Sequence, residues 1–114
     1  MVQQHVINIS QHLGTSRALL RQSGTGIFEE AKPYVEKGEV VVLDFDGMTT
    51  VGTAFFHGSI GNLYKFNSSN FDYLVRVKNM TQPEWAWKYN QALMHARHPR
   101  KQESLQKALA ELAD

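Results

Sequence analysis

The sequence contains no cysteine, which excludes disulfide bonds, thiol catalysis and thiolate metal sites from this chain. No apolar run approaches the roughly 18 residues that a membrane-spanning helix requires. Neither sign of charge dominates, since 12 Lys and Arg stand against 11 Asp and Glu for a net charge of +1. This balance argues against a nucleic-acid-binding protein. The N-terminus lacks the basic region and apolar segment of a secretory signal, so we expect a cytoplasmic protein with no membrane partner.

The chain has 114 residues, of which 42% are hydrophobic, so we expect one domain over residues 1–114 with a substantial core. Apolar patterns typical of strands and helices alternate along it, which predicts an α/β fold: a small, mostly parallel sheet of three to four strands with packing helices. The expected strands are 6–10, 39–45 and 73–77, and the expected helices are 26–37, 53–65, 82–98 and 101–113. Thr25 and Thr81 are the expected caps of two helices, and residues 14–26 are expected to form a loop with one or two helical turns.

The stretch V-V-V-L-D-F-D-G-M-T-T, residues 40–50, has two interpretations. Its aspartates, Asp44 and Asp46, stand as in the D-x-D-G-T motif of haloacid-dehalogenase-like phosphatases, which would make the protein a magnesium-dependent enzyme. However, Met48 stands where that motif has threonine, and no two of the acids after Asp46 are adjacent or one residue apart. The alternative is a buried strand ending in a turn, with Asp44 hydrogen-bonded to that turn.

The same stretch resembles the central segment of STAS domains, the fold of anti-sigma-factor antagonists, and it is most similar to a bacterial STAS-like family of uncharacterised function. The residues that carry the resemblance are Gly14–Arg17, Val41–Gly47 and Ala54–Phe55. The resemblance spans about residues 5–97, and the last predicted helix, about 101–113, lies outside it. It implies a STAS-like, non-catalytic, protein-binding domain that acts in signalling and regulation. STAS domains bind partner proteins, typically ATP-binding kinases of the GHKL type, through the helix start that follows the central strand.

In the antagonists a serine at that helix start is phosphorylated to switch binding off. Here Ala54 occupies the serine's position and Gly52 the position of an aspartate two residues before it. Thr53 is the nearest hydroxyl; we expect it to be the N-cap of the helix, and its phosphorylation is the alternative. The partner-binding residues that the resemblance implies are Arg17, Thr49, Thr50, Gly52, Thr53 and His57.

Some of these features have structural alternatives. Arg17 could form a salt bridge to an acid of the central strand instead of binding a partner. Trp85 and Trp87 cannot share one helix face, so we expect one in the core and the other as an exposed anchor for a partner. The basic segment 95–101 is interpreted as a solvated connector, and its histidines, His95 and His98, are not assigned as metal ligands.

We therefore expect a protein-binding module without catalysis, cofactor or metal, whose partner is a GHKL-type kinase or an anti-sigma factor; a second copy of the chain is another candidate partner. The alternatives are the phosphatase that uses Asp44 and Asp46 and a small nucleic-acid-associated protein.

Overall fold

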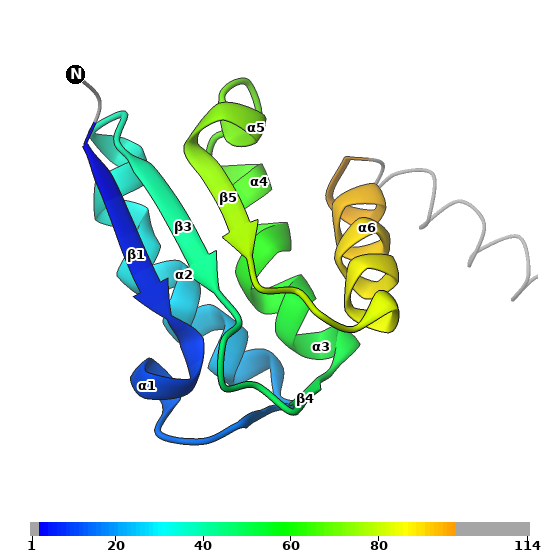
Figure 1. Ribbon diagram of the computed structural model, residues 1–114. Coiled ribbons are helices and arrows are strands. Elements are labelled where there is room, and N and C mark those ends of the chain that lie inside the picture. Colours follow the sequence, from blue (N-terminus) through cyan, green and yellow to red (C-terminus); the bar gives the residue numbers. More distant parts are fainter. Residues whose placement is uncertain (1–2, 98–114) are drawn as a thin grey trace, which may run out of the picture.

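The computed structural model describes residues 3–97. The fold is built on three parallel strands (Figure 1). Strands β1 (Gln4–Asn8), β3 (Val40–Asp44) and β5 (Val75–Lys78) lie in the order β1-β3-β5, and each neighbouring pair is parallel. A second, two-stranded parallel sheet joins β2 (Arg17–Ala18) to β4 (Thr50–Val51). The predicted α/β class with a small parallel sheet is confirmed.

Helices connect the strands and cover one face of the main sheet (Figure 1). Their bounds are α1 (Ile9–Leu13), α2 (Arg21–Glu36), α3 (Thr53–Phe56), the π-helix η1 (His57–Gly61), α4 (Asn62–Phe66), α5 (Phe71–Leu74) and α6 (Pro83–Arg97). Segments α3, η1 and α4 follow one another without a break, so they form one helix with a wide turn at its centre. Within residues 3–97, no helix is long and apolar enough to cross a membrane.

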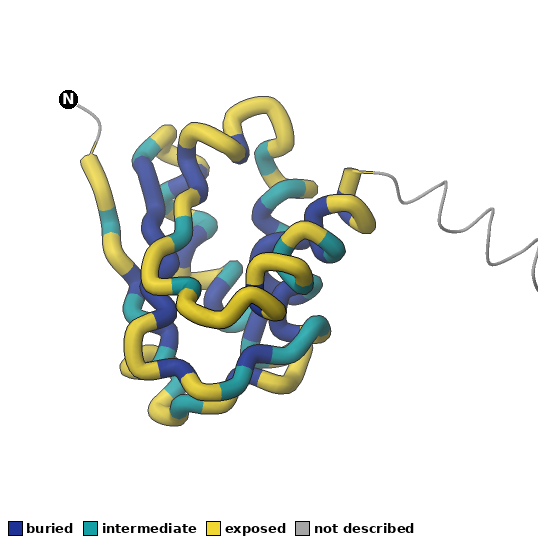
Figure 2. The backbone as a smooth tube through the Cα atoms, turned by 45° about the vertical axis from the view of Figure 1, so that its right-hand side comes forward, coloured by how far each residue is buried: buried dark blue, intermediate teal, exposed yellow. Residues whose placement is uncertain are grey.

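The core lies between the sheet and these helices (Figure 2). All five residues of β3, the central strand of the sheet, are buried. Beyond the sheet, Phe45 stacks against Phe56 with ring centroids 5.8 Å apart and meets Trp85 of α6 at 6.0 Å. These contacts join the end of the central strand to α3 and α6, the two helices that flank the candidate site.

Helix α2 crosses the π-helix at a point where only glycine fits. A Cβ atom on Gly24 would overlap the carbonyl oxygen of Phe55 and lie 2.8 Å from the amide nitrogen of Ser59. A Cβ atom on Gly58 would overlap the carbonyl oxygen of Arg21. The two backbones are therefore in direct contact, and this contact fixes the position of α3 relative to the start of α2.

The structure corrects several predicted boundaries. Helix α2 begins at Arg21, so Thr25 lies inside the helix, where its hydroxyl donates to the Arg21 carbonyl at 3.1 Å instead of capping the first turn. The segment predicted as a loop with helical turns contains a strand, β2, because its backbone pairs with β4. Helix α2 also continues for three residues beyond Pro33.

Further along the chain, Tyr73 belongs to the short helix α5 and not to a strand. Helix α6 begins at Pro83, a residue favoured at the first helical position. Its buried side chains are Trp85, Ala92, Leu93 and Ala96, and Tyr89 packs against the core from a half-buried position. Trp85 is buried and Trp87 is exposed, as expected of two tryptophans on different faces. The predicted helix at 101–113 lies outside the described residues.

Candidate protein-binding surface

The β2–β4 pair brings the two halves of the predicted site together. Arg17 pairs with Thr50, so residues that are 33 positions apart in the chain share one edge. The amide of Thr49 donates to the Ser16 carbonyl at 2.8 Å, and its hydroxyl donates to the same oxygen at 3.2 Å. The amide of Gly52 extends the ladder by donating to Ala18 at 2.8 Å. These bonds hold the segment before α3 in a fixed, extended conformation.

Helix α3 starts directly after this segment. Gly52, with φ −94° and ψ 160°, is the N-cap residue, and Thr53 is the first helical residue. The prediction that Thr53 caps the helix is therefore wrong, because the β2–β4 ladder keeps the backbone extended through Gly52. Thr53 is half-buried and Ala54 is exposed. The first turn of the helix is accessible to a partner through these two residues.

His57 lies one turn along the same helix and faces α6. Its ring meets the ring of His95 edge to face, with centroids 5.0 Å apart and planes at 86°. Burial lowers the pKa of His57 below its ordinary value of 6.5, and the proximity of His95 and the positive charges of Arg21 and Lys65 lower it further. His57 is therefore neutral at pH 7 and resists protonation in the folded protein.

This shift predicts a loss of stability in mild acid. Above pH 6.5 His57 is neutral in both the folded and unfolded states. As the pH falls below 6.5, the unfolded chain binds the proton first, so the free energy of unfolding decreases. Urea denaturation from pH 7.5 downward is expected to give a shallower decrease for His57→Gln than for the wild type. Equal decreases in the two proteins would contradict the assignment.

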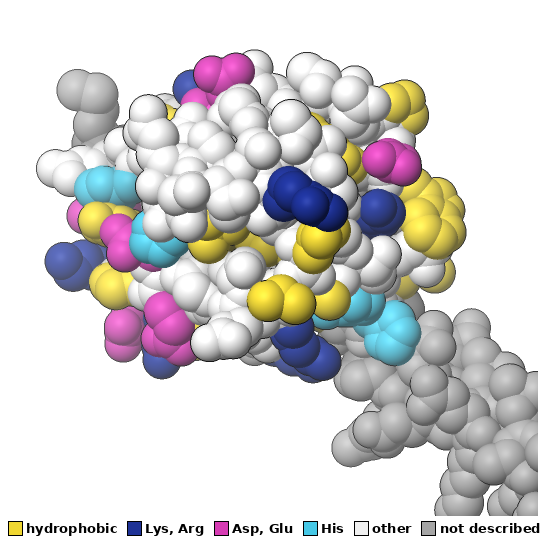
Figure 3. All heavy atoms as spheres, turned by 90° about the horizontal axis from the view of Figure 1, so that it is seen from below, with side chains coloured by type: hydrophobic (Ala, Val, Ile, Leu, Met, Phe, Trp, Pro, Cys, Tyr) yellow, Lys and Arg dark blue, Asp and Glu magenta, His cyan; other side chains and the backbone are white. Residues whose placement is uncertain are grey.

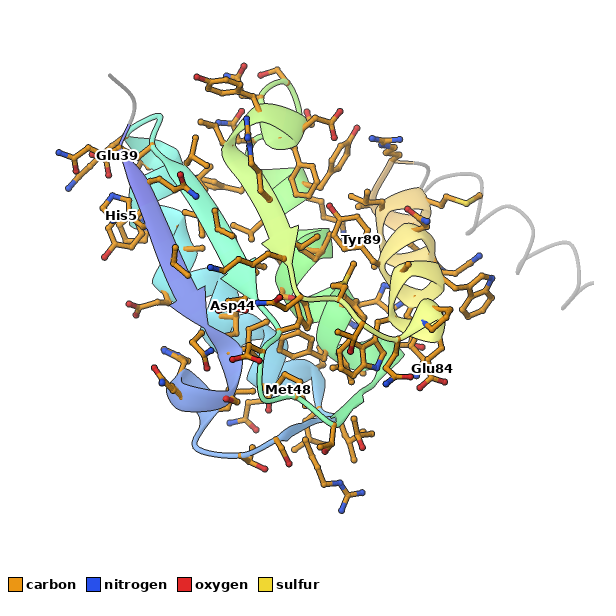
Figure 4. All side chains as sticks on the ribbon, in the orientation of Figure 1. His5, Glu39, Asp44, Met48, Glu84 and Tyr89 are labelled. Atoms are coloured by element: carbon orange, nitrogen blue, oxygen red, sulfur yellow. The ribbon has the colours of Figure 1, made fainter. Side chains whose placement is uncertain are left out.

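Asp44, at the carboxyl end of β3, is engaged by its own chain (Figure 4). Its Oδ1 atom accepts the amide of Asp46 at 3.0 Å and the side-chain amide of Asn79 at 2.7 Å, and its Oδ2 atom lies 3.9 Å from the ammonium of Lys78. Burial favours the protonated acid, but these hydrogen bonds and the charge of Lys78 outweigh it and lower the pKa of Asp44. The predicted hydrogen bond from Asp44 to the following turn is confirmed.

Comparison with known proteins identifies the fold family. Residues 23–85, more than half of the chain, match the model of a family described as a STAS-like domain of unknown function (DUF4325). The chain belongs to this STAS-like family. No curated protein and no solved structure gives a significant match. The matched region of the STAS-like domain contains the central strand, β4 and α3, whereas Arg17 lies before it.

The STAS-like domain also places beside the helix start residues that the sequence did not single out. Leu19 and Leu20, between β2 and α2, are 42% and 65% exposed. Lys88 of α6 donates to the Val51 carbonyl at 3.0 Å and so ties α6 to β4. Both leucines lie in the segment that was predicted as a loop with one or two helical turns, and the structure shows that their side chains are exposed.

Arg17 itself is exposed, and the ion pairs found within residues 3–97 do not include it, so the alternative of a salt bridge to the central strand is not realised. Seen from the end of the molecule that carries β4 and the start of α3, hydrophobic side chains lie among Lys, Arg and His side chains, while acidic side chains lie towards the rim (Figure 3). The structure therefore brings Arg17, Thr49, Thr50, Gly52 and Thr53 together around the helix start, with His57 one turn further along.

Proposed function

We propose that this STAS-like domain is a non-catalytic regulatory module that binds a partner protein through the turn and helix start at residues 49–57. The observation that carries the proposal is the fixed, exposed helix start: Gly52 is held by the backbone of Ala18, and Ala54 projects from the first turn into solvent. A preformed surface of this kind binds without a large ordering cost.

The position of Asp44 favours binding over phosphoryl chemistry. An aspartate nucleophile needs a free carboxylate oxygen directed at the substrate. Here one oxygen accepts two hydrogen bonds from Asp46 and Asn79, and the other lies near Lys78. These contacts support a structural role, in which Asp44 organises the turn that leads to β4 and α3.

The resemblance to the anti-sigma-factor antagonists suggests the kind of partner, namely a GHKL-type ATP-binding kinase or an anti-sigma factor. The usual phosphorylation switch would differ here, since Ala54 carries no hydroxyl. Thr53 supplies the adjacent hydroxyl, and a phosphate on it would add about two negative charges at the edge of the binding surface.

The proposal predicts that a charge at residue 53 abolishes partner binding. Tagged wild-type protein and Thr53→Glu would be incubated with lysate of the source organism, and the captured proteins would be compared by quantitative mass spectrometry. A partner is expected to be enriched by the wild type and reduced at least about tenfold by Thr53→Glu, because a charged group is then buried in the interface. Glutamate in the first turn of a helix is favourable, so the variant is expected to fold.

Lys37→Glu is the matched control, since it adds negative charge on an exposed residue just after the far end of α2. It is expected to capture the partner as the wild type does. Equal capture by wild type and Thr53→Glu would place binding on another surface, and the absence of any specific partner would overturn the proposed function.

A further inference from the structure

An apolar pair flanked by positive charge adjoins the helix start. Leu20, at 65% exposure, is the most exposed large hydrophobic residue within residues 3–97, and Leu19 beside it is 42% exposed. Neither lies on a free loop: Leu20 immediately precedes α2, and Leu19 packs against Gly52, where a Cβ atom would come within 3.3 Å of the Leu19 carbonyl oxygen. The backbone therefore holds two exposed leucines at a fixed position beside the helix start.

Basic residues flank the two leucines in the chain. Arg17 precedes them and Arg21 follows them, and both are exposed. Arg21 and Lys65 also place positive charge near His57. We call Arg17, Leu19, Leu20, Arg21 and His57 the Arg–Leu surface. Its chemistry is apolar at the centre and cationic around it.

We propose that the Arg–Leu surface binds an acidic amphipathic segment of the partner protein. The apolar side chains of that segment cover Leu19 and Leu20, and its carboxylates pair with Arg17 and Arg21, whose guanidinium groups are suited to bidentate contact with carboxylates. This inference rests on the proposed function and specifies the partner's chemistry. A nucleic acid is disfavoured because the exposed residues between Arg17 and Arg21 in the chain are leucines, where a nucleic-acid site would place further cations or aromatic rings.

A peptide selection tests the inference directly. A phage library of random amphipathic peptides would be selected on the immobilised full-length protein, and the enriched peptides synthesised and measured by fluorescence anisotropy. We expect the enriched sequences to combine Asp or Glu with Leu, Ile or Phe. Their Kd is expected to rise at least about tenfold when the ionic strength is raised from about 0.01 M to about 1 M, since the Debye length falls from about 30 Å to about 3 Å.

Charge reversal locates the binding. Arg21→Glu is expected to weaken the selected peptides at least about tenfold, and because Arg21 is the first residue of α2, glutamate there is favourable for the helix. Leu20→Ser is expected to weaken them by a similar factor. Lys37→Glu, the matched control, leaves the Kd unchanged. Enriched peptides that are neutral or basic, no enrichment, or equal affinity for Arg21→Glu would each overturn the inference.

Binding to vesicles of phosphatidylglycerol and phosphatidylcholine is measured separately, because an anionic membrane also combines negative charge with an apolar interior. Binding to these vesicles without enrichment of acidic peptides would assign the surface to lipid and overturn the inference. Failure of the inference is distinguishable from failure of the proposed function. A cellular partner that is lost on Thr53→Glu but insensitive to Arg21→Glu would leave the protein-binding function in place and reject only the acidic partner.

Discussion

Gly24→Ala is expected to lower the free energy of unfolding by about 3 kcal/mol, a large share of the stability of a domain of this size. The added methyl group would overlap the Phe55 carbonyl oxygen and lie 2.8 Å from the amide nitrogen of Ser59. The Phe55 oxygen and the Ser59 nitrogen are backbone atoms of α3 and the π-helix, so no side-chain rotation relieves the clash. Helix α2 and the π-helix must move apart, and the helix start moves with them.

Gly26→Ala is the matched control, because it makes the same change two residues later in the same helix. A Cβ atom on Gly26 has no atom within 4 Å, and alanine is about 1 kcal/mol better than glycine in a helix interior. Urea denaturation is therefore expected to find Gly26→Ala slightly more stable than the wild type and Gly24→Ala much less stable. Similar stabilities for the two variants would contradict the close crossing of the helices.

Trp85→Ala is expected to cost about 3–5 kcal/mol, the range for removal of a buried aromatic side chain. Trp85 is 1% exposed and packs against Phe45 at the end of the central strand. Its loss leaves a cavity between α6 and the sheet, next to β4 and the helix start. Partner binding is expected to weaken along with stability, since Lys88 of the same helix holds the β4 backbone.

Trp87→Ala provides the comparison, with the same change of side chain two residues away. Trp87 is 61% exposed, so its removal is expected to change the free energy of unfolding by less than about 0.5 kcal/mol. Thermal denaturation of both variants against the wild type measures the difference. A large destabilisation by Trp87→Ala, or a small one by Trp85→Ala, would show that α6 packs through its other face.

The sequence predicted correctly those strands and helices whose pattern of apolar residues follows directly from which side chains are buried. The run Val40–Leu43 has no polar residue and became the central strand. The spacing of Trp85 and Trp87 predicted that the two side chains lie on different faces of α6, and the structure shows that Trp85 is the buried one. In such segments local pattern and tertiary packing agree.

Elements that depend on contacts distant in sequence were missed. Helix α2 begins at Arg21 and not at the predicted residue 26, so Gly24 lies within the helix, where another backbone passes against it. Strand β2 has two residues and is defined only by its pairing with β4. Gly58 and Gly61 are buried within the π-helix, and a Cβ atom on Gly58 would overlap the carbonyl oxygen of Arg21 in the crossing helix. No local propensity encodes these contacts.

The candidate site was predicted in part. The resemblance grouped Arg17 with Thr49 and Thr50, and the β2–β4 pairing brings them together. The exact start of the helix depended on the ladder bond from Gly52 to Ala18, which displaced Thr53 from the cap position. Leu19 and Leu20 fell in the segment 14–26, predicted as a loop with one or two helical turns, and their exposure became clear only from the structure.

Photo-crosslinking at Ala54 tests directly whether a partner protein binds through the helix start. Ala54 is exposed in the first turn of α3, and a benzoylphenylalanine placed there would lie in the proposed interface. The same probe at Lys37, an exposed residue just after the far end of α2, is the control. In cells of the source organism, we expect a discrete crosslinked partner from position 54 and none from position 37. No specific crosslink from position 54, or the same crosslinks from both positions, would contradict binding through the helix start.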